Sequence, residues 1–217
     1  MQTSKSKRNV NWRRTLIFLA GVSAVIYGYV QTFTKGIDRL PERPCAGAVD
    51  RALVASALPS SRTAEEQGKL EQGLHGFTFQ CYVRTSGDSS LVGDAQTGKG
   101  SDPKTWKAHY LQKRDDDTPI EVSAGDLRAL SLSPDLATVY VPCTPPRSRL
   151  PAENLIVEAT TIGPTRAKGD ELRQVVVDFA YQLLRHAYEA GGCEEARDFP
   201  DALPRLTEGR VVEEPVG

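Results

Sequence analysis

The strongest constraint on this chain is an uncharged, apolar run between Arg14 and Lys35. A helix rises about 1.5 Å per residue, so a run of this length just crosses a hydrocarbon core of about 30 Å. We therefore predict a transmembrane helix over residues 15–34. Trp12 and Tyr29 lie towards its two ends, where aromatic side chains anchor spanning helices.

The charges on the two flanks predict the orientation of this helix. The flank after the run mixes bases with acids, whereas the segment 1–14 holds bases and no acid, namely Lys5, Lys7, Arg8, Arg13 and Arg14. By the positive-inside rule, the N-terminus stays in the cytoplasm. Everything after about residue 35 is then extracytoplasmic, beginning with a short linker over 35–44 at the cell membrane.

Several other N-terminal signals compete with an uncleaved anchor. Val22-Ser23-Ala24 is a candidate signal-peptide cleavage site, but the apolar run continues to Val30, which favours the anchor. Arg13-Arg14 has the form of a twin-arginine signal, although positive-inside charges explain it better. A lipoprotein needs small residues before its cysteine, whereas Cys45 follows Glu42-Arg43-Pro44. The basic flank disfavours a buried core helix.

The net charge of the exported part limits the classes of partner that it can bind. The whole chain has 27 basic and 28 acidic residues. Without the five N-terminal bases, 22 remain against 28 acids, a net charge of −6. This charge favours solubility and argues against a nucleic-acid surface. About 180 residues follow the span, enough for one domain with its own core.

All four cysteines lie after the predicted span, namely Cys45, Cys81, Cys143 and Cys193. No two of them form a CxxC pair that would suggest zinc or a redox centre. In an oxidising compartment we expect two disulfides. Three pairings are possible. We favour Cys45–Cys81 and Cys143–Cys193, because each joins neighbouring elements. Closing either loop stabilises a chain by about 4 kcal/mol in the chain-entropy model.

Apolar periodicity predicts two helices and several strands. Residues 46–58 and 170–190 carry helical spacing, the second with Asp170 as N-cap and Gly191-Gly192 as its end. Phe77 to Arg84 alternates as a half-buried strand and places Cys81 on the core face. Further strands are predicted over 106–111, 120–122, 137–143 and 154–162. The polar segment 64–73 reads as a short helix or loop, and 86–101 as turns with a short strand at Leu91-Val92.

This order predicts an α+β fold, in which an antiparallel sheet packs against two helices. The extracytoplasmic domain would cover 45–197, followed by an extended, flexible tail over 198–217. The segment Cys45-Ala46-Gly47-Ala48-Val49, a helix end at Leu58-Pro59 and a strand bearing Cys81 resemble uncharacterised membrane-anchored or secreted proteins of high-GC actinobacteria. The resemblance implies a four-cysteine extracytoplasmic domain and no particular activity.

No complete catalytic or metal-binding pattern is present. Gly93 to Lys99 matches the GxxxxGK frame of a phosphate loop, but Gly100 stands where Ser or Thr must hold Mg²⁺, so we interpret it as a polar loop. Asp115-Asp116-Asp117 lacks the alternation of a calcium loop. No Gly-x-Ser-x-Gly elbow supports a triad, and the histidines have no metal-ligand spacing: His75, His109 and His186.

The leading hypothesis is a single-pass membrane protein whose extracytoplasmic domain binds an envelope protein or small ligand. We predict no cofactor, metal or nucleic-acid partner. Aromatic residues expected on or near the sheet could mark the binding surface or its packing: Tyr82, Trp106, Tyr110 and Tyr140. An envelope hydrolase with a dispersed site is the alternative, favoured if a cleft gathers His109 or His186 with carboxylates. A structural membrane subunit is a third hypothesis, based on small residues at Ala20, Gly21, Ala24 and Gly28.

Overall fold

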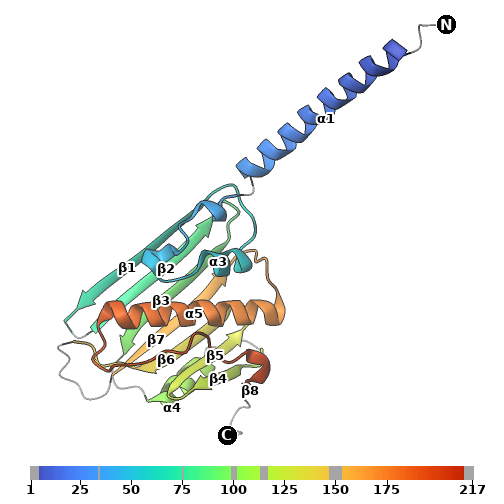
Figure 1. Cartoon of the computed structure of the whole chain (residues 1–217). Helices are drawn as coiled ribbons and strands as arrows, with labels where there is room; N and C mark the ends of the chain where they lie inside the picture. The colour runs from blue at the N-terminus through green and yellow to red at the C-terminus, as the bar shows by residue number, and fades with distance from the viewer. Residues whose placement is uncertain are drawn as a thin grey trace.

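The computed structural model describes residues 5–33, 35–74, 76–98, 102–112, 117–146 and 153–212. In these residues the fold is α+β, with a single antiparallel sheet below an N-terminal helix that projects away from it (Figure 1). The helices are α1 (Lys5–Phe33), α2 (Pro44–Gly47), α3 (Arg51–Ala57), α4 (Pro103–Leu111) and α5 (Gly169–Gly191), with 3-10 turns η1 (Ile37–Arg39) and η2 (Leu206–Glu208).

The described strands form one sheet in the order β1-β2-β3-β7-β6-β5-β4-β8, and every neighbouring pair is antiparallel. Their bounds are β1 (Ala64–Gly73), β2 (Gly76–Thr85), β3 (Ser90–Gly98), β4 (Ile120–Ala124), β5 (Leu127–Ser133), β6 (Leu136–Pro142), β7 (Asn154–Ile162) and β8 (Arg210–Val211).

The helix α1 contains a stretch, Trp12–Thr32, that is long and apolar enough to cross a membrane. None of that stretch is buried by the rest of the chain. A free helix with so much exposed apolar surface is unfavourable in water. Together with the disulfides, it indicates a membrane-anchored or secreted protein whose domain folds in an oxidising compartment.

The main core lies between one face of the sheet and the long helix α5, with α3 beside it (Figure 1). Gly93 of β3 shows how closely the layers approach: a Cβ there would lie 2.4 Å from Leu183 and 2.9 Å from Phe179. The helix α5 ends as predicted, because Gly192 adopts a left-handed conformation (φ 72°) at its C-cap. Its N-cap, however, is Lys168 rather than Asp170.

Two disulfides tie this core to its periphery. Cys45 is joined to Cys81, and Cys143 is joined to Cys193. The first bond holds α2 over β2, and the second fixes the second residue after α5 to the residue that follows β6. Among the residues whose burial is described, all of the buried core residues lie between Ile37 and Val212, so none of the described side chains of α1 belongs to the core.

The predicted helix over 46–58 is only partly present. Pro44–Gly47 forms one tight turn in which Cys45 and Ala46 have positive φ (59° and 57°), and the regular helix spans only Arg51–Ala57. The turn lies against β1: the backbone N–H of Cys45 donates to the Glu66 carboxylate at 2.6 Å. The disulfide and this hydrogen bond hold the left-handed turn in place.

Three further predictions are corrected. Residues 64–73, expected as a helix or loop, form the edge strand β1, and 86–101 contains the nine-residue strand β3. Residues 106–111, expected as a strand, belong to the helix α4, because Trp106 and Tyr110 are spaced for one helix face as well as for alternation. The strand β5 was not predicted, because both of its faces are largely buried and it shows no alternation.

The segment for which a flexible tail is predicted packs onto the domain as far as residue 212. Phe199 contacts the ring of Tyr188 at 5.1 Å between centroids. The backbone N–H of Leu206 donates to Gln174 of α5 at 2.9 Å, and β8 pairs with β4. These contacts bury Leu203, which a free tail would expose to solvent.

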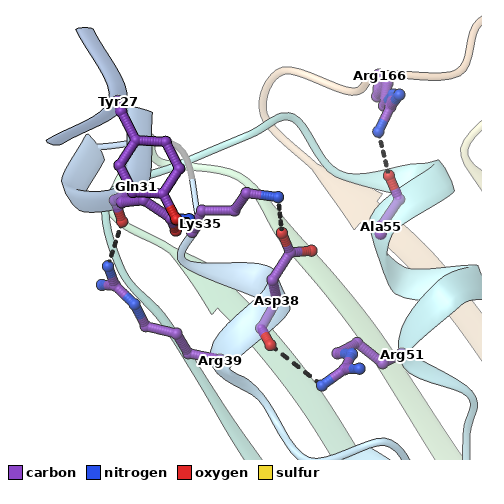
Figure 2. Close-up of polar contacts among 8 residues, drawn as sticks. All are labelled: Tyr27, Gln31, Lys35, Asp38, Arg39, Arg51, Ala55 and Arg166. Atoms are coloured by element: carbon purple, nitrogen blue, oxygen red, sulfur yellow. Dashed lines mark hydrogen bonds and ion pairs between the residues drawn. The ribbon is translucent and has the colours of Figure 1, made fainter. Parts of the chain in front are cut away.

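The predicted linker over 35–44 is tied to both of its neighbours (Figure 2). The Arg39 guanidinium donates to the Gln31 carbonyl of α1 at 2.5 Å and to the Arg62 carbonyl before β1 at 3.3 Å. Gly36 donates its N–H to the Ser61 carbonyl at 2.8 Å. The domain is therefore held directly at the end of α1.

Candidate functional site

The outer face of the sheet, opposite α5, is covered over only part of its width. The helix α4 packs on β5 and β6, where it forms a second core of buried residues: Trp106, Tyr110, Leu130, Leu132, Tyr140 and Val212. On β7 the helix α4 reaches Ile156, and no described helix covers the other outward side chains of β1, β2, β3 and β7, which we call the open face. The burial pattern of β2 alternates accordingly, buried towards α5 and exposed or half-buried outward.

The helix α4 is fixed in place by a cap and by one buried side chain. Asp102 accepts hydrogen bonds from the backbone N–H groups of Lys104 and Thr105, at 2.8 and 3.0 Å, and Pro103 starts the helix. Trp106 is 1% exposed and donates its indole N–H to Thr138 of β6 at 3.2 Å. These contacts hold the next turn of α4, with His109 and Tyr110, against β7.

A cleft of about 390 Å³ lies where α4 meets the open face. It is lined by residues of β3, α4 and β7, namely Asp94, Gln96, Gly98, His109, Tyr110, Ile156 and Glu158. Asp94 and Glu158 are direct cross-strand partners, so both carboxylates point outward from neighbouring strands. Gln80 donates to Asp94 at 3.0 Å and orients that carboxylate.

Electrostatics couple Tyr110 to this cleft. Burial of the phenol, and next the negative charge of Glu158, raise the pKa of Tyr110 to about 12. The phenol therefore stays neutral over the physiological range, and its side-chain hydrogen bond with Glu158 ties it to the wall of the cleft. The cleft presents two carboxylates, one amide, an imidazole and a phenol within one cavity, with Ile156 as its apolar contribution.

This arrangement suits recognition of a polar ligand. Gln96 offers an amide that can both donate and accept, and the carboxylates favour ligands with hydroxyl or cationic groups. Among the described residues, no group of three or more His, Cys, Asp or Glu side chains is placed to hold a metal ion. The lining residues include no Ser, Thr or Cys that could serve as a covalent nucleophile.

The open face continues from the cleft across β2 and β1. Tyr82 is 40% exposed and donates its hydroxyl to Gln67 of the neighbouring strand at 2.9 Å. The other aromatics proposed for a binding surface, Trp106, Tyr110 and Tyr140, are buried in the second core, so they pack the domain. Tyr82 alone among the four is available as an exposed aromatic on the sheet.

The histidines are not brought together. His109 lines the cleft on the outer face, whereas His186 lies on α5 at the inner face, in edge contact with Phe79 at 4.9 Å. Burial lowers the pKa of His186, so it is a neutral packing side chain at physiological pH. His75 lies outside the described residues.

The remaining motifs resolve into structural roles. Gly93 to Gly98 of the GxxxxGK frame form the strand β3, not the polar loop that was predicted, and Gly93 is required by the close approach of α5. Lys99 lies outside the described residues, as do Asp115 and Asp116. Asp117 pairs with the buried Arg173 of α5 at 3.2 Å.

Sequence reasoning did not select the two cleft carboxylates. Asp94 appeared only inside the phosphate-loop frame, and Glu158 alternates with apolar residues of β7 like any outward residue. Nothing in the sequence indicates that β3 and β7 are neighbours, because strands of this kind pair across 60 or so residues of intervening chain. The cleft is a product of the sheet order.

An apolar N-terminal helix, an α+β domain and two disulfides define a membrane-anchored or secreted protein. Comparison with protein-family models, with curated proteins and with solved structures finds no match for this chain. Its function is therefore inferred from its own residues.

Proposed function

We propose that this chain is a single-pass protein of the cell membrane, with a cytoplasmic N-terminus, whose extracytoplasmic domain binds an envelope partner on its open face. The anchor is supported by the free apolar helix α1 and the bases that precede it. The observation that supports binding best is the cleft between β3, β7 and α4. Its varied polar lining is what recognition of a protein or small ligand requires.

The topology is tested by differential thiol labelling of the full chain in intact cells, before and after reduction. We expect Cys45, Cys81, Cys143 and Cys193 to resist labelling until they are reduced, and then to react with a membrane-impermeant reagent. Labelling only after cell lysis would place the domain inside the cell. Free labelling without reduction would show that the disulfides are not formed.

Binding is tested by placing a photo-crosslinking amino acid at Gln96, in the cleft, and at Glu189 on the exposed side of α5 as a matched control. We expect a specific adduct from Gln96 in intact cells and none from Glu189. The double variant Asp94→Asn, Glu158→Gln should weaken the Gln96 adduct without changing the folded domain. Equal adducts at the two positions would argue against a specific site on the open face.

One observation favours hydrolysis as a second function: the cleft gathers His109 with Asp94 and Glu158. An imidazole and carboxylates in one cavity can supply a general acid and a general base. This function predicts that the purified protein turns over an envelope substrate and that His109→Ala abolishes turnover while the disulfides and the unfolding midpoint stay unchanged. Binding of the substrate without turnover would leave the binding function alone.

A further inference from the structure

The strand β1 forms one margin of the sheet, and no strand in the described part of the chain pairs with its outer edge (Figure 1). It is 10 residues long, none of them is buried, and its register with β2 runs without a shift. At the opposite margin, β8 has only 2 residues. Proteins usually shorten, bend or cover the edges of their sheets. β1 is therefore a long and regular edge that no described strand closes.

The main-chain groups on this outer edge can be assigned residue by residue. Ser86 donates its N–H to the carbonyl of Thr63 at 3.0 Å, one residue before the ladder begins at Ala64 and Thr85. In an antiparallel pair, each residue directs both of its main-chain groups to one side, and the side alternates along the strand. The odd-numbered residues of β1 therefore bond to β2. The even-numbered residues direct their N–H and C=O groups to the outer edge, namely Ala64, Glu66, Gly68, Leu70 and Gln72.

The spacing of these outward groups defines what can bind them. A donor and an acceptor recur together at every second residue, about 7 Å apart along the edge. The main chain of another β-strand has the same repeat, so an extended peptide can satisfy the whole row by adding a strand to the sheet. The edge of β1 is therefore suited to an extended polypeptide.

The charges on the outward face of β1 do not select this polypeptide. Lys69 forms an ion pair with Glu71 at 2.5 Å, and Glu65 lies directly opposite Arg84 of β2. Acid and base thus stand side by side along this row. Selectivity at the edge must come from main-chain hydrogen bonds and from apolar contacts on the other face of β1.

On that inner face, two half-buried apolar residues, Ala64 and Leu70, pack against the main core. Between them, Gly68 lies under the turn α2, and Glu66 accepts the N–H of Cys45 at 2.6 Å. A strand added beside β1 would bury apolar side chains against Ala64 and Leu70, with small side chains next to α2. Because Ala64 and Leu70 are six residues apart, the two apolar residues of the added strand must also be six residues apart.

We propose that the outer edge of β1 binds an extended segment of another envelope protein by strand addition, with two apolar residues of that segment against Ala64 and Leu70. A second copy of β1 has the same apolar spacing, but two copies joined at the same edge by a two-fold axis run antiparallel. Because β1 begins at the end of the domain next to α1, the two α1 helices would then point in opposite directions and could not enter one membrane (Figure 1). This exclusion of a second copy rests on the proposed membrane anchor.

The test uses the full chain in nanodiscs of phosphatidylcholine and the synthetic probe Thr-Val-Thr-Ser-Thr-Ser-Thr-Val-Thr, whose valines are six residues apart. Amide hydrogen exchange is resolved residue by residue along β1. At about ten times its dissociation constant, the probe should slow exchange by about tenfold at the even-numbered amides Glu66, Gly68 and Leu70. The odd-numbered amides, which already bond to β2, should not change. The control peptide Thr-Val-Thr-Ser-Thr-Ser-Val-Thr-Thr, whose valines point to opposite faces, should give no such protection.

Two variants test the edge itself. Ala64→Pro removes an outward N–H but no bond to β2, at a strand start where proline is tolerated, and should weaken probe binding by about fivefold or more. Leu70→Ser removes an apolar contact and should weaken it roughly fivefold. The matched control is Leu74→Ser, at a leucine just past β1 that is 92% exposed, and it should leave binding unchanged. The exchange of the odd-numbered amides reports in each variant whether β1 stays paired with β2.

Three results would overturn the proposal: equal protection by the two peptides, no protection by either, or a change at odd and even amides alike. Protection without any probe that rises with protein concentration would assign the edge to a second copy instead. Release of the chain from membranes by alkaline carbonate would overturn the anchor, which the probe experiment does not measure. The cleft lies on β3, β7 and α4, so the adduct at Gln96 succeeds or fails independently of the edge of β1.

Discussion

Gly68 of β1 lies directly under the main chain of Cys45, so that a Cβ at Gly68 would come 2.3 Å from the Cys45 carbonyl carbon. Gly68 is also the cross-strand partner of Cys81, to which Cys45 is bonded. The first disulfide can therefore close only because the strand beside it offers no side chain at this position. A glycine inside a strand here marks the close approach of another segment of backbone.

Gly68→Ala is predicted to destabilise the domain by about 2 kcal/mol or more, because the obstructing atoms belong to backbone that the disulfide holds in place. The measurement is urea unfolding of the oxidised protein. Gly73→Ala, on the same strand, is the matched control: its Cβ would have no contact closer than 3.5 Å, and we expect almost no change. Equal effects of the two substitutions would contradict the packing of α2 on β1.

Removal of the second disulfide should cost about 4 kcal/mol in the chain-entropy model. Cys143→Ala with Cys193→Ala opens a loop with a sequence separation of 50 and frees the end of α5 from β6. The expected result is a lower urea midpoint, checked beside the wild-type protein before and after reduction. A double variant as stable as the oxidised wild type would show that this bond does not constrain the folded domain.

The ion pair between Asp126 and Arg197 is predicted to make stability depend on acid pH. Arg197 donates through both terminal nitrogens to Asp126, with Nη2 at 2.8 Å from Oδ2, and this hydrogen bonding lowers the pKa of Asp126. Its stabilisation is therefore present above the unfolded Asp value of 3.8 and is lost as the pH falls through the lower folded pKa. Because Asp126 is half-exposed, we expect only about 1 kcal/mol.

Asp126→Asn tests this ion pair. The variant should be less stable than the wild type at neutral pH, and the difference should shrink as the pH falls below 3.8. Thermal unfolding over a pH series measures it. Asp198→Asn, at the exposed residue next to Arg197, should leave stability unchanged. A difference between Asp126→Asn and the wild type that persists undiminished in acid would assign the effect to packing rather than to charge.

The titration of Tyr110 reports on the geometry of the cleft. Burial raises its pKa most and the charge of Glu158 raises it further, to about 12. Glu158→Gln should therefore lower the pKa of Tyr110 while leaving it above the ordinary value of 10.0. Ring-labelled tyrosine observed by NMR during a pH titration, with Tyr110→Phe for assignment, measures the change. Glu189→Gln on α5 should leave the pKa of Tyr110 unchanged. An unchanged pKa in Glu158→Gln as well would show that Glu158 does not interact with the phenol.

The sequence alone was sufficient where one element carries its own complete pattern. The apolar stretch of α1, long enough to cross a membrane, is specified by its length and lack of charge, and α5 by its apolar stripe and Gly192. The alternation over 77–84 identified β2 with Cys81 on its core face, because a strand with one buried face must repeat every two residues. The α+β class followed from the order of such elements.

Only the tertiary structure explains the elements whose residue types are set by contacts with a neighbouring element. The sequence of β1 is polar because its inward residues Glu66 and Gly68 contact the main chain of Cys45 and not an apolar core. In α4, Trp106 and Tyr110 satisfy the helical and the alternating period alike. The local cap at Asp102 favours the helix, and the packing of Trp106 on β6 fixes which face is buried.

The cleft could not be predicted from local sequence patterns. Asp94 and Glu158 become partners only when β3 and β7 pair, and His109 joins them only when α4 folds onto the same face. A periodic pattern reports which side of an element is buried, but it contains no information on which element lies next to it. The physical reason is that the identity of a neighbour is set by the packing free energy of the whole sheet, whereas the period of a segment is set by its own backbone geometry.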